Sequence, residues 1–297
     1  MLTGKARSKA RRRLPSLACA AFVIAALGRL YAMDWPTENG LLLSNFGWNS
    51  RGRPLAGSVF ETRDAVRAVE DGTLLFVHQP DSGASPLPSP LGCWAAVDHG
   101  DGLISIYGKL NPDRPEPEPE QVSRGQVVAE PEPPEGAADP GSFYFSFYDR
   151  KERRWVNPSM IIASQEDTVA PVIFSVELRG SSGAINPAQG RRLAQGRYTV
   201  VVNAADSQRP NRPPALAPQR IICSVNGMEI GVLAFETWSA RDGALTQGGL
   251  PVRQIYAPAP GWELGELRLT RGQATLEIIV QDAAGNARNA LYRLQVE

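Results

Sequence analysis

Few residues of this chain could bind a metal ion or transfer a proton. His78 and His99 are the only histidines among 297 residues, and no spacing joins them in a metal-binding pattern. Asp98 precedes His99, but adjacent residues of a strand point to opposite faces, which argues against a catalytic pair. His78 ends an apolar run and stands near Pro80, which is typical of a surface residue at the start of a loop. Since no phosphate loop, serine-nucleophile motif or paired-carboxylate motif occurs either, we expect no metal and no cofactor.

Two cysteines lie in apolar runs that resemble strands. Cys93 precedes Trp94, and Cys223 follows two isoleucines. Core cysteines behave as small hydrophobic residues, so we predict buried free thiols, with a disulfide bridge as the alternative. No CxxC or Cys/His spacing indicates a metal site.

The first 32 residues are basic and then apolar. They hold no acid and seven bases: Lys5, Arg7, Lys9, Arg11, Arg12, Arg13 and Arg29. This charge, followed by the apolar run 17–27 and the small residue Ala32, is typical of an export signal. We predict cleavage after Ala32. An uncleaved N-terminal membrane anchor is the alternative, although the run is shorter than the roughly 20 residues that span a bilayer. Either way, the protein is expected in the periplasm or cell envelope.

The rest of the chain predicts an all-β protein. Its 28 glycines and 25 prolines favour short strands and turns, and no stretch has the spacing of a long amphipathic helix. The bases of the first 32 residues leave an excess of acids elsewhere, which gives no support for nucleic-acid binding. Strands are predicted at 41–45, 65–69, 72–77, 93–98, 103–107, 126–129 and 142–148, with proline-rich loops at 80–90, 112–120 and 130–141.

Residues 164–171 (SQEDTVAP) are polar and end in a proline, which predicts a linker after a first domain at 33–163. Beyond it, strands are predicted at 172–178, 196–204, 220–225, 228–235, 254–257, 265–269, 273–281 and 290–296, the pattern of a β-sandwich. The segment IIVQDAAGN at 278–286 resembles the V-x-D-x-x-G-N ending of many bacterial immunoglobulin-like modules. The resemblance implies an immunoglobulin-like domain at 172–297, in which Asp282 and Asn286 set the turn between the last two strands.

The first domain contains five motif-like fragments in order: SNFGW at 44–48, AVRAVEDGTL at 65–74, WAAVDHGDGLISIY at 94–107, GQVV at 125–128 and WVNP at 155–158. In this order they resemble motifs of the lysostaphin-type (LytM-like) zinc endopeptidases of peptidoglycan. The resemblance covers 41–162. It implies the β-sheet domain of that family, built on a duplicated hybrid motif.

The positions at which this family holds its zinc carry other residues here. The motif HxGxDI reads LAGSVF, which places Leu55 at the histidine and Val59 at the aspartate; the histidine of YAHL is Lys109. The H-x-H strand reads FYF, which places Phe143 and Phe145 at its two histidines. Zinc needs about four lone-pair donors, whereas hydrocarbon side chains offer none and a lysine repels a cation. The resemblance therefore implies a pseudoenzyme without catalytic residues, and His99 lies in a turn where the family does not use its histidine as a ligand.

Two interpretations of these positions stay open. Alternation along a strand places Phe143, Phe145 and Phe147 on one face. The rings either fill the former site as hydrophobic core or, together with Lys109, line an open groove that holds a partner.

The leading functional hypothesis is a non-catalytic cell-envelope protein, a scaffold or regulator that binds a peptidoglycan hydrolase or another envelope protein. A peptidoglycan-binding wall anchor without a protein client is the alternative. A third hypothesis is an active cell-wall endopeptidase with an unusual metal site.

Overall fold

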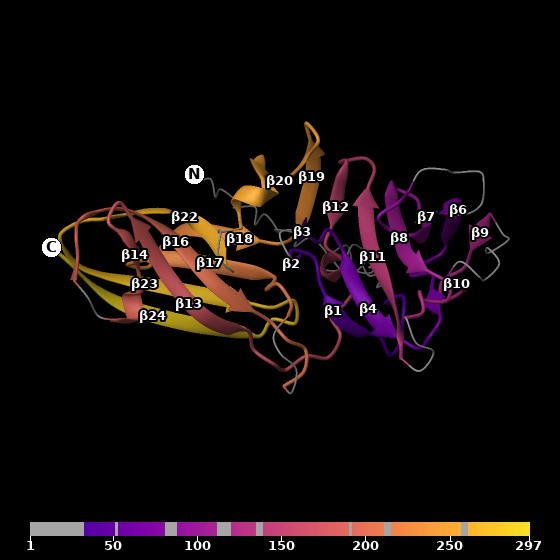
Figure 1. Cartoon of the computed structure of the whole chain (residues 1–297), viewed down its shortest axis with the longest axis horizontal. Coiled ribbons are helices and arrows are strands. Elements are labelled where there is room, and N and C mark those ends of the chain that lie inside the picture. Colours follow the sequence, from indigo (N-terminus) through magenta and orange to yellow (C-terminus); the bar gives the residue numbers. More distant parts are fainter. Residues whose placement is uncertain are drawn as a thin grey trace, which may run out of the picture. The chain divides into compact units, whose positions relative to one another are not determined.

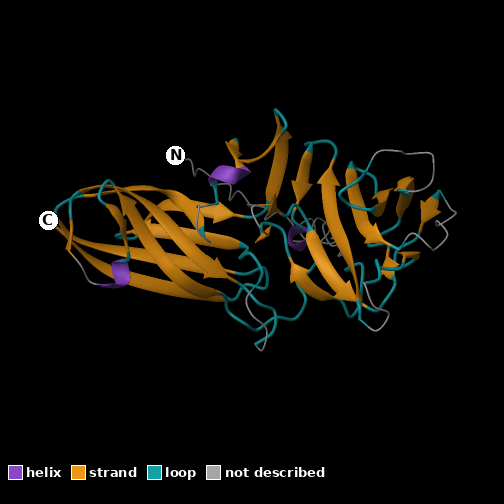
Figure 2. Cartoon of the chain, in the orientation of Figure 1, coloured by secondary structure: helices purple, strands orange, loops and turns teal. Residues whose placement is uncertain are grey.

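The computed structural model describes residues 33–50, 53–80, 88–111, 120–134, 139–189, 192–210, 215–256 and 261–297. The predicted signal at 1–32 and most of the proline-rich loops lie outside these ranges. The predicted all-β class is confirmed, because within these ranges strands account for nearly all the regular structure and helical structure is limited to three short 3-10 turns (Figure 2). In the described part, no helix is long and apolar enough to cross a membrane.

The first part of the chain builds most of an 11-stranded sheet. Its centre is β11 (Gly141–Asp149), which pairs along one side with β8 (Leu103–Leu110). On the other side, β4 (Ser58–Thr62) pairs with the first half of β11, and β12 (Arg154–Val156) pairs with its end. The remaining strands of this part are β1 (Leu41–Ser44), β2 (Asn49–Ser50), β3 (Arg53–Pro54), β5 (Val66–Arg67), β6 (Gly72–His78), β7 (Cys93–Asp98), β9 (Gln121–Val122) and β10 (Val127–Ala129).

Alternation along the strands groups the aromatic rings of this sheet on one face, and this face is the buried one. Phe143, Phe145 and Phe147 of β11 are fully buried together with Phe60 of β4 and Tyr107 of β8. Phe60 and Phe143 are opposite in register, and their ring centroids lie 5.3 Å apart. Burial of an aromatic side chain contributes roughly 1.5–3 kcal/mol, so this row of rings is a main source of stability for the sheet.

The C-terminal part is a sandwich of two sheets, as the predicted strand pattern requires. One sheet has the order β14-β13-β16-β22 and the other β15-β24-β23-β17-β18. In β23, buried Leu276, Ile278 and Val280 alternate with partly exposed residues, which is the pattern of a strand with one face in a core. The strands are β13 (Val172–Gly180), β14 (Gly183–Ile185), β15 (Arg192–Leu193), β16 (Gly196–Ala205), β17 (Arg220–Val225), β18 (Met228–Ala234), β22 (Trp262–Leu269), β23 (Gly272–Gln281) and β24 (Ala287–Val296).

A hairpin that the sequence did not predict extends the first sheet with strands from the second half of the chain. It consists of β19 (Thr237–Arg241), β20 (Ala244–Gln247) and β21 (Leu250–Pro251). Strand β19 pairs with β12, with Trp155 opposite Trp238 (Figure 1). The 11-stranded sheet therefore contains strands from both sides of the predicted linker.

The two parts also share a hydrophobic core. Phe46, in the turn after β1, is fully buried in the same cluster as the residues between the sandwich sheets. The backbone of Asn157 donates to the Glu236 carbonyl (2.8 Å), and its side-chain amide donates to the Phe235 carbonyl (2.7 Å). The Asn45 side chain forms a reciprocal pair with the Ala217 backbone at 2.7 and 2.8 Å.

Three local predictions have a clear outcome. Cys93 and Cys223 are buried and form no disulfide, as predicted. The prediction that His78 is a surface residue is wrong, because its side chain is buried beside Trp94 at the end of β6. The predicted strand at 254–257 is also wrong in its described part, where the 3-10 turn η3 (Val252–Gln254) leads into Ile255 and Tyr256.

Candidate functional site

Val59, which the sequence predicts at the aspartate position of a metallopeptidase motif, shares its face of the sheet with Tyr144 and not with Phe143 or Phe145. In β4 it lies directly opposite Tyr144 of β11, and Tyr144 in turn lies opposite Gly108 of β8. Side chains of directly paired residues lie on the same face of a sheet. Val59 and Tyr144 therefore share one face, and their neighbours Phe60 and Phe143 share the other.

This register places the predicted site residues on two faces of the sheet. Phe143 and Phe145 are 0% exposed and belong to the core face, on the opposite side of the sheet from Val59. Of the two interpretations that the sequence left open for these rings, the filled core therefore holds and the open groove does not. Phe143 and Phe145 each lie one residue from Tyr144 along β11. Their rings therefore point to the face opposite that of Val59.

Tyr144 and Ser146 lie on the same face of β11 as Val59, together with Ser142 and Tyr148. Ser146 is buried, and its hydroxyl interacts with the Tyr144 phenol. The phenol of Tyr144 donates to the Ala56 carbonyl at 3.1 Å. A Cβ on Gly57 would lie only 2.6 Å from that phenol oxygen and 2.4 Å from the Phe145 carbonyl, so the 56–57 backbone packs directly on Tyr144. Burial raises the pKa of Tyr144 to about 12, which keeps the phenol neutral.

Leu55 and Lys109 lie beside this face with different surroundings. The backbone of Leu55 is tied to the 46–48 turn, since Gly47 N donates to Leu55 O and Leu55 N donates to Trp48 O, both at 2.9 Å. Lys109 is exposed, with a left-handed backbone (φ 57°), and its ammonium lies 4.0 Å from the Glu132 carboxylate. An ion pair at such exposed positions contributes little to stability.

The chemistry available at Val59 is therefore poor in metal ligands. Protein zinc ligands are Cys, His, Asp and Glu, whereas the side chains here are aliphatic, hydroxyl and ammonium groups. In the ranges that the structure describes, three or more such ligand residues come together only at Asp167, Asp206 and Asp282, which lie on other elements. The sequence analysis missed this cluster, although each aspartate directly follows a strand or lies in the predicted linker.

His99 has a structural environment. Its Nδ1 donates to the Asp71 carbonyl (2.8 Å), and its Nε2 lies 2.7 Å from Ser105 Oγ, which is 3.0 Å from the Tyr107 phenol. Val69 N donates to the same phenol at 3.1 Å. The chain of hydrogen bonds joins the β7–β8 turn to the core, and burial lowers the pKa of His99.

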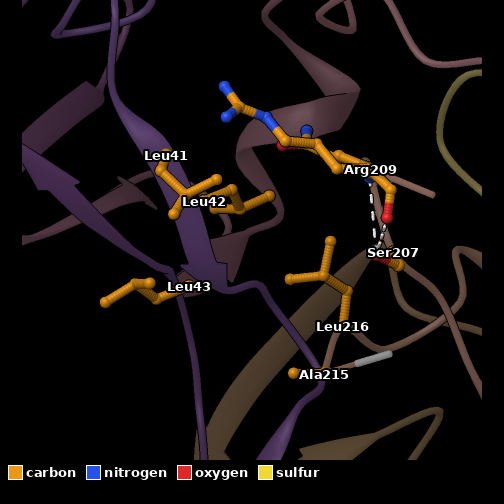
Figure 3. A pocket seen from close by; sticks show the side chains of 8 residues that line it. Leu41, Leu42, Leu43, Ser207, Arg209, Ala215 and Leu216 are labelled. Atoms are coloured by element: carbon orange, nitrogen blue, oxygen red, sulfur yellow. Dashed lines mark hydrogen bonds between the residues drawn. The ribbon is translucent and has the colours of Figure 1, made fainter. Parts of the chain in front are cut away.

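A pocket of about 160 Å³ lies between β1 and the segment after β16. Leu41, Leu42 and Leu43 line one side, and Ser207, Arg209 and Leu216 are among the residues on the other (Figure 3). Arg209 is the only ionisable side chain among its lining residues. The lining therefore offers apolar surface and no acid–base pair.

Comparisons with known proteins place the chain among similar structures but give it no family. A family model matches residues 170–297, which is less than half of the chain. No curated protein matches the chain.

Three solved structures are similar to parts or most of the chain. The catalytic domain of the prophage-encoded M23 protein EnpA from Enterococcus faecalis is 17% identical, with a TM-score of 0.30, over 40% of this chain and 87% of that one. The SpoIIQ–SpoIIIAH pore-forming complex gives 17% identity and a TM-score of 0.32, over 44% and 90%. Lysostaphin gives 13% identity and a TM-score of 0.36, over 89% and 91%. Since each TM-score is below 0.5, the function has to be inferred from the residues of this chain.

Proposed function

We propose that this chain is a non-catalytic cell-envelope protein, whose first part is a LytM-like domain that has lost its zinc. The observation that carries the proposal is the register of β4 and β11. Val59 stands at the aspartate position, and the β11 side chains on its face are serines and tyrosines, with Tyr144 directly opposite Val59, instead of histidines. Neither a valine nor a neutral phenol or hydroxyl replaces the carboxylate and imidazoles with which this class of site binds zinc.

The backbone of residues 56–57 also packs on this face. The Tyr144 phenol donates to the Ala56 carbonyl, and Gly57 packs on its ring. A zinc-bound water needs an open position next to the metal, and these contacts occupy the space beside Tyr144. The missing ligands and this packing support a binding function over hydrolysis.

Among the possible binding functions, we favour a scaffold or regulator for an envelope protein such as a peptidoglycan hydrolase. Strand β6 pairs with β9 only at Gly72 and Thr73, so the outer edge of β6 beyond Leu74 has no strand partner among the residues that the structure describes. Leu75 and Phe76 on this stretch are 47% and 46% exposed, and the Phe76 ring lies 5.1 Å from that of Trp94. An unpaired strand edge with exposed apolar side chains is a surface to which a partner strand can add.

Two measurements on the purified full chain test the proposal. We expect less than one tenth of a zinc ion per chain and no release of muropeptides from purified sacculi. Stoichiometric zinc together with muropeptide release would overturn the non-catalytic assignment. Sedimentation with sacculi then separates the binding functions: strong binding to sacculi without a co-purifying envelope protein favours a wall anchor and contradicts the protein-client proposal.

A further inference from the structure

Three carboxylates gather at one end of the C-terminal sandwich. Asp206 follows β16, Asp282 follows β23, and Asp167 lies in the segment that leads into β13. One ligand oxygen from each lies within 4.8 Å of the others. The strand pairing explains why Asp167 and Asp206 lie close together, because the start of β13 lies opposite the end of β16.

This cluster contains an unsatisfied buried acceptor. Asp206 is 5% exposed, and its Oδ1 has no hydrogen-bond partner in the described part of the chain. An isolated ionised carboxylate is costly to bury. Burial and the charges of Asp282 and Asp167 raise the pKa of Asp206 to about 7. None of the three aspartates forms an ion pair with a base among the described residues.

The other two carboxylates are held in place by local hydrogen bonds. Asp282 accepts from the backbone and side-chain amides of Asn286, both at 2.8 Å. The Asn286 side chain also donates to the Asp167 carbonyl at 3.1 Å. Asp167 in turn accepts from Val169 N at 2.8 Å. The positions of these two carboxylates are therefore fixed by the fold before any ligand binds.

We infer that Asp167, Asp206 and Asp282 form a Ca²⁺ site that joins the 164–171 segment to the sandwich. Carboxylate oxygens are the ligands of hard cations, and Ca²⁺ binds them at about 2.4 Å, so two ligand oxygens on one ion lie at most about 4.8 Å apart. Zinc would require nitrogen or sulfur ligands for comparable affinity, and Mg²⁺ tolerates a preformed set of three carboxylates less well because it needs near-ideal octahedral geometry. A cation would satisfy Asp206 Oδ1 and offset the repulsion among the three charges.

The space beside the acids fits this assignment. A pocket of about 30 Å³ is lined by Asp167, Asp206 and Ser164, among others. This is roughly the volume of one water molecule in the liquid, so an ion or a coordinating water can enter. Ser164 Oγ donates to the Ala283 carbonyl (2.7 Å), which places further oxygen atoms of both segments at the pocket.

The test uses the full chain after removal of divalent ions with a chelator. Equilibrium dialysis with Ca²⁺ is expected to give one bound ion per chain. Thermal unfolding is expected to show a rise in Tm of about 5 °C at a free Ca²⁺ concentration near 100 times Kd, with a smaller rise in Mg²⁺. No bound Ca²⁺ in the folded chain, or equal stabilisation by Mg²⁺, overturns the assignment.

Variants locate the ion. Asp206→Asn should abolish the Tm rise in Ca²⁺, while its Tm without Ca²⁺ stays equal to or above that of the unaltered chain because a buried charge is removed. Asp167→Asn, at a more exposed position, serves as the second variant and should weaken Ca²⁺ binding at least tenfold. Asp242→Asn is the matched control, since this carboxylate is 96% exposed and lies outside the cluster. A Ca²⁺ response that persists in both Asp206→Asn and Asp167→Asn contradicts the site.

Discussion

The ring of Phe46 lies against that of Trp238, with centroids 4.5 Å apart and both side chains fully buried. Phe46 belongs to the SNFGW turn of the first part, and Trp238 belongs to the hairpin that extends the sheet from the second part. This contact fills the core that the two parts share. Gly47 completes it, because a Cβ at this position would lie 2.6 Å from the Phe235 ring.

Phe46→Ala should therefore destabilise the whole described unit. Truncation of a fully buried phenylalanine to alanine costs about 3–5 kcal/mol. The measurement is urea unfolding followed by both tryptophan fluorescence and far-UV circular dichroism. Phe174→Ala is the matched control, since Phe174 is 54% exposed and should change the free energy of unfolding by less than about 0.5 kcal/mol. Equal effects of the two variants would contradict the shared core.

The sequence predicted most strands because their burial pattern is local. Cys93–Asp98 and Arg220–Val225 were predicted with the bounds that the structure has. The β19–β21 hairpin was missed, because its strands are short and its stabilising partner β12 is distant in sequence. The sequence did not decide whether Phe143 and Phe145 lie in the core or in a groove, since alternation groups the rings on one face but does not say whether that face is buried. The Asp167, Asp206 and Asp282 cluster also depends on contacts between distant elements.

The register of β4 and β11 predicts which substitutions can restore a metal site. A chain with Leu55→His, Val59→Asp and Tyr144→His places all three new ligands at or beside one face, with the last two directly paired. A chain with Phe145→His in place of Tyr144→His puts the imidazole in the core, on the opposite face. We expect the first to bind Zn²⁺ at least tenfold more tightly than the second in competition with a chromophoric chelator. Equal affinities would show that the face assignment is wrong.

His99 predicts a dependence of stability on pH. Burial lowers the pKa of His99 in the folded state below the ordinary histidine value of about 6.5, so the unfolded chain binds the proton more readily as the pH falls through this value. The contribution of His99 to stability is therefore present above about pH 6.5 and is lost towards lower pH. The raised pKa of Asp206 changes stability with pH in the opposite direction. This effect is the same in the unaltered protein and in His99→Gln, so it cancels when the two are compared.

The comparison of these two chains gives the measurement. Urea unfolding at pH 5 and pH 7.5 should show a larger loss of stability at pH 5 for the unaltered chain than for His99→Gln. The glutamine amide retains one donor for the Asp71 carbonyl, so the fold should persist. An identical pH dependence in the two proteins would exclude His99 as the group responsible.

The exposed edge of β6 predicts where a protein partner binds. Leu75→Glu together with Phe76→Glu adds charge to the unpaired stretch of this strand, which disfavours addition of a partner strand. Because both side chains are about half exposed, stability should change little. Leu250→Glu is the control, as Leu250 is 61% exposed on β21 at the other end of the same sheet. Quantitative mass spectrometry of envelope proteins cross-linked to the tagged full chain should show at least a tenfold loss of the partner with the double variant and none with the control. Retention of the same partner at full yield by the double variant would place the contact elsewhere.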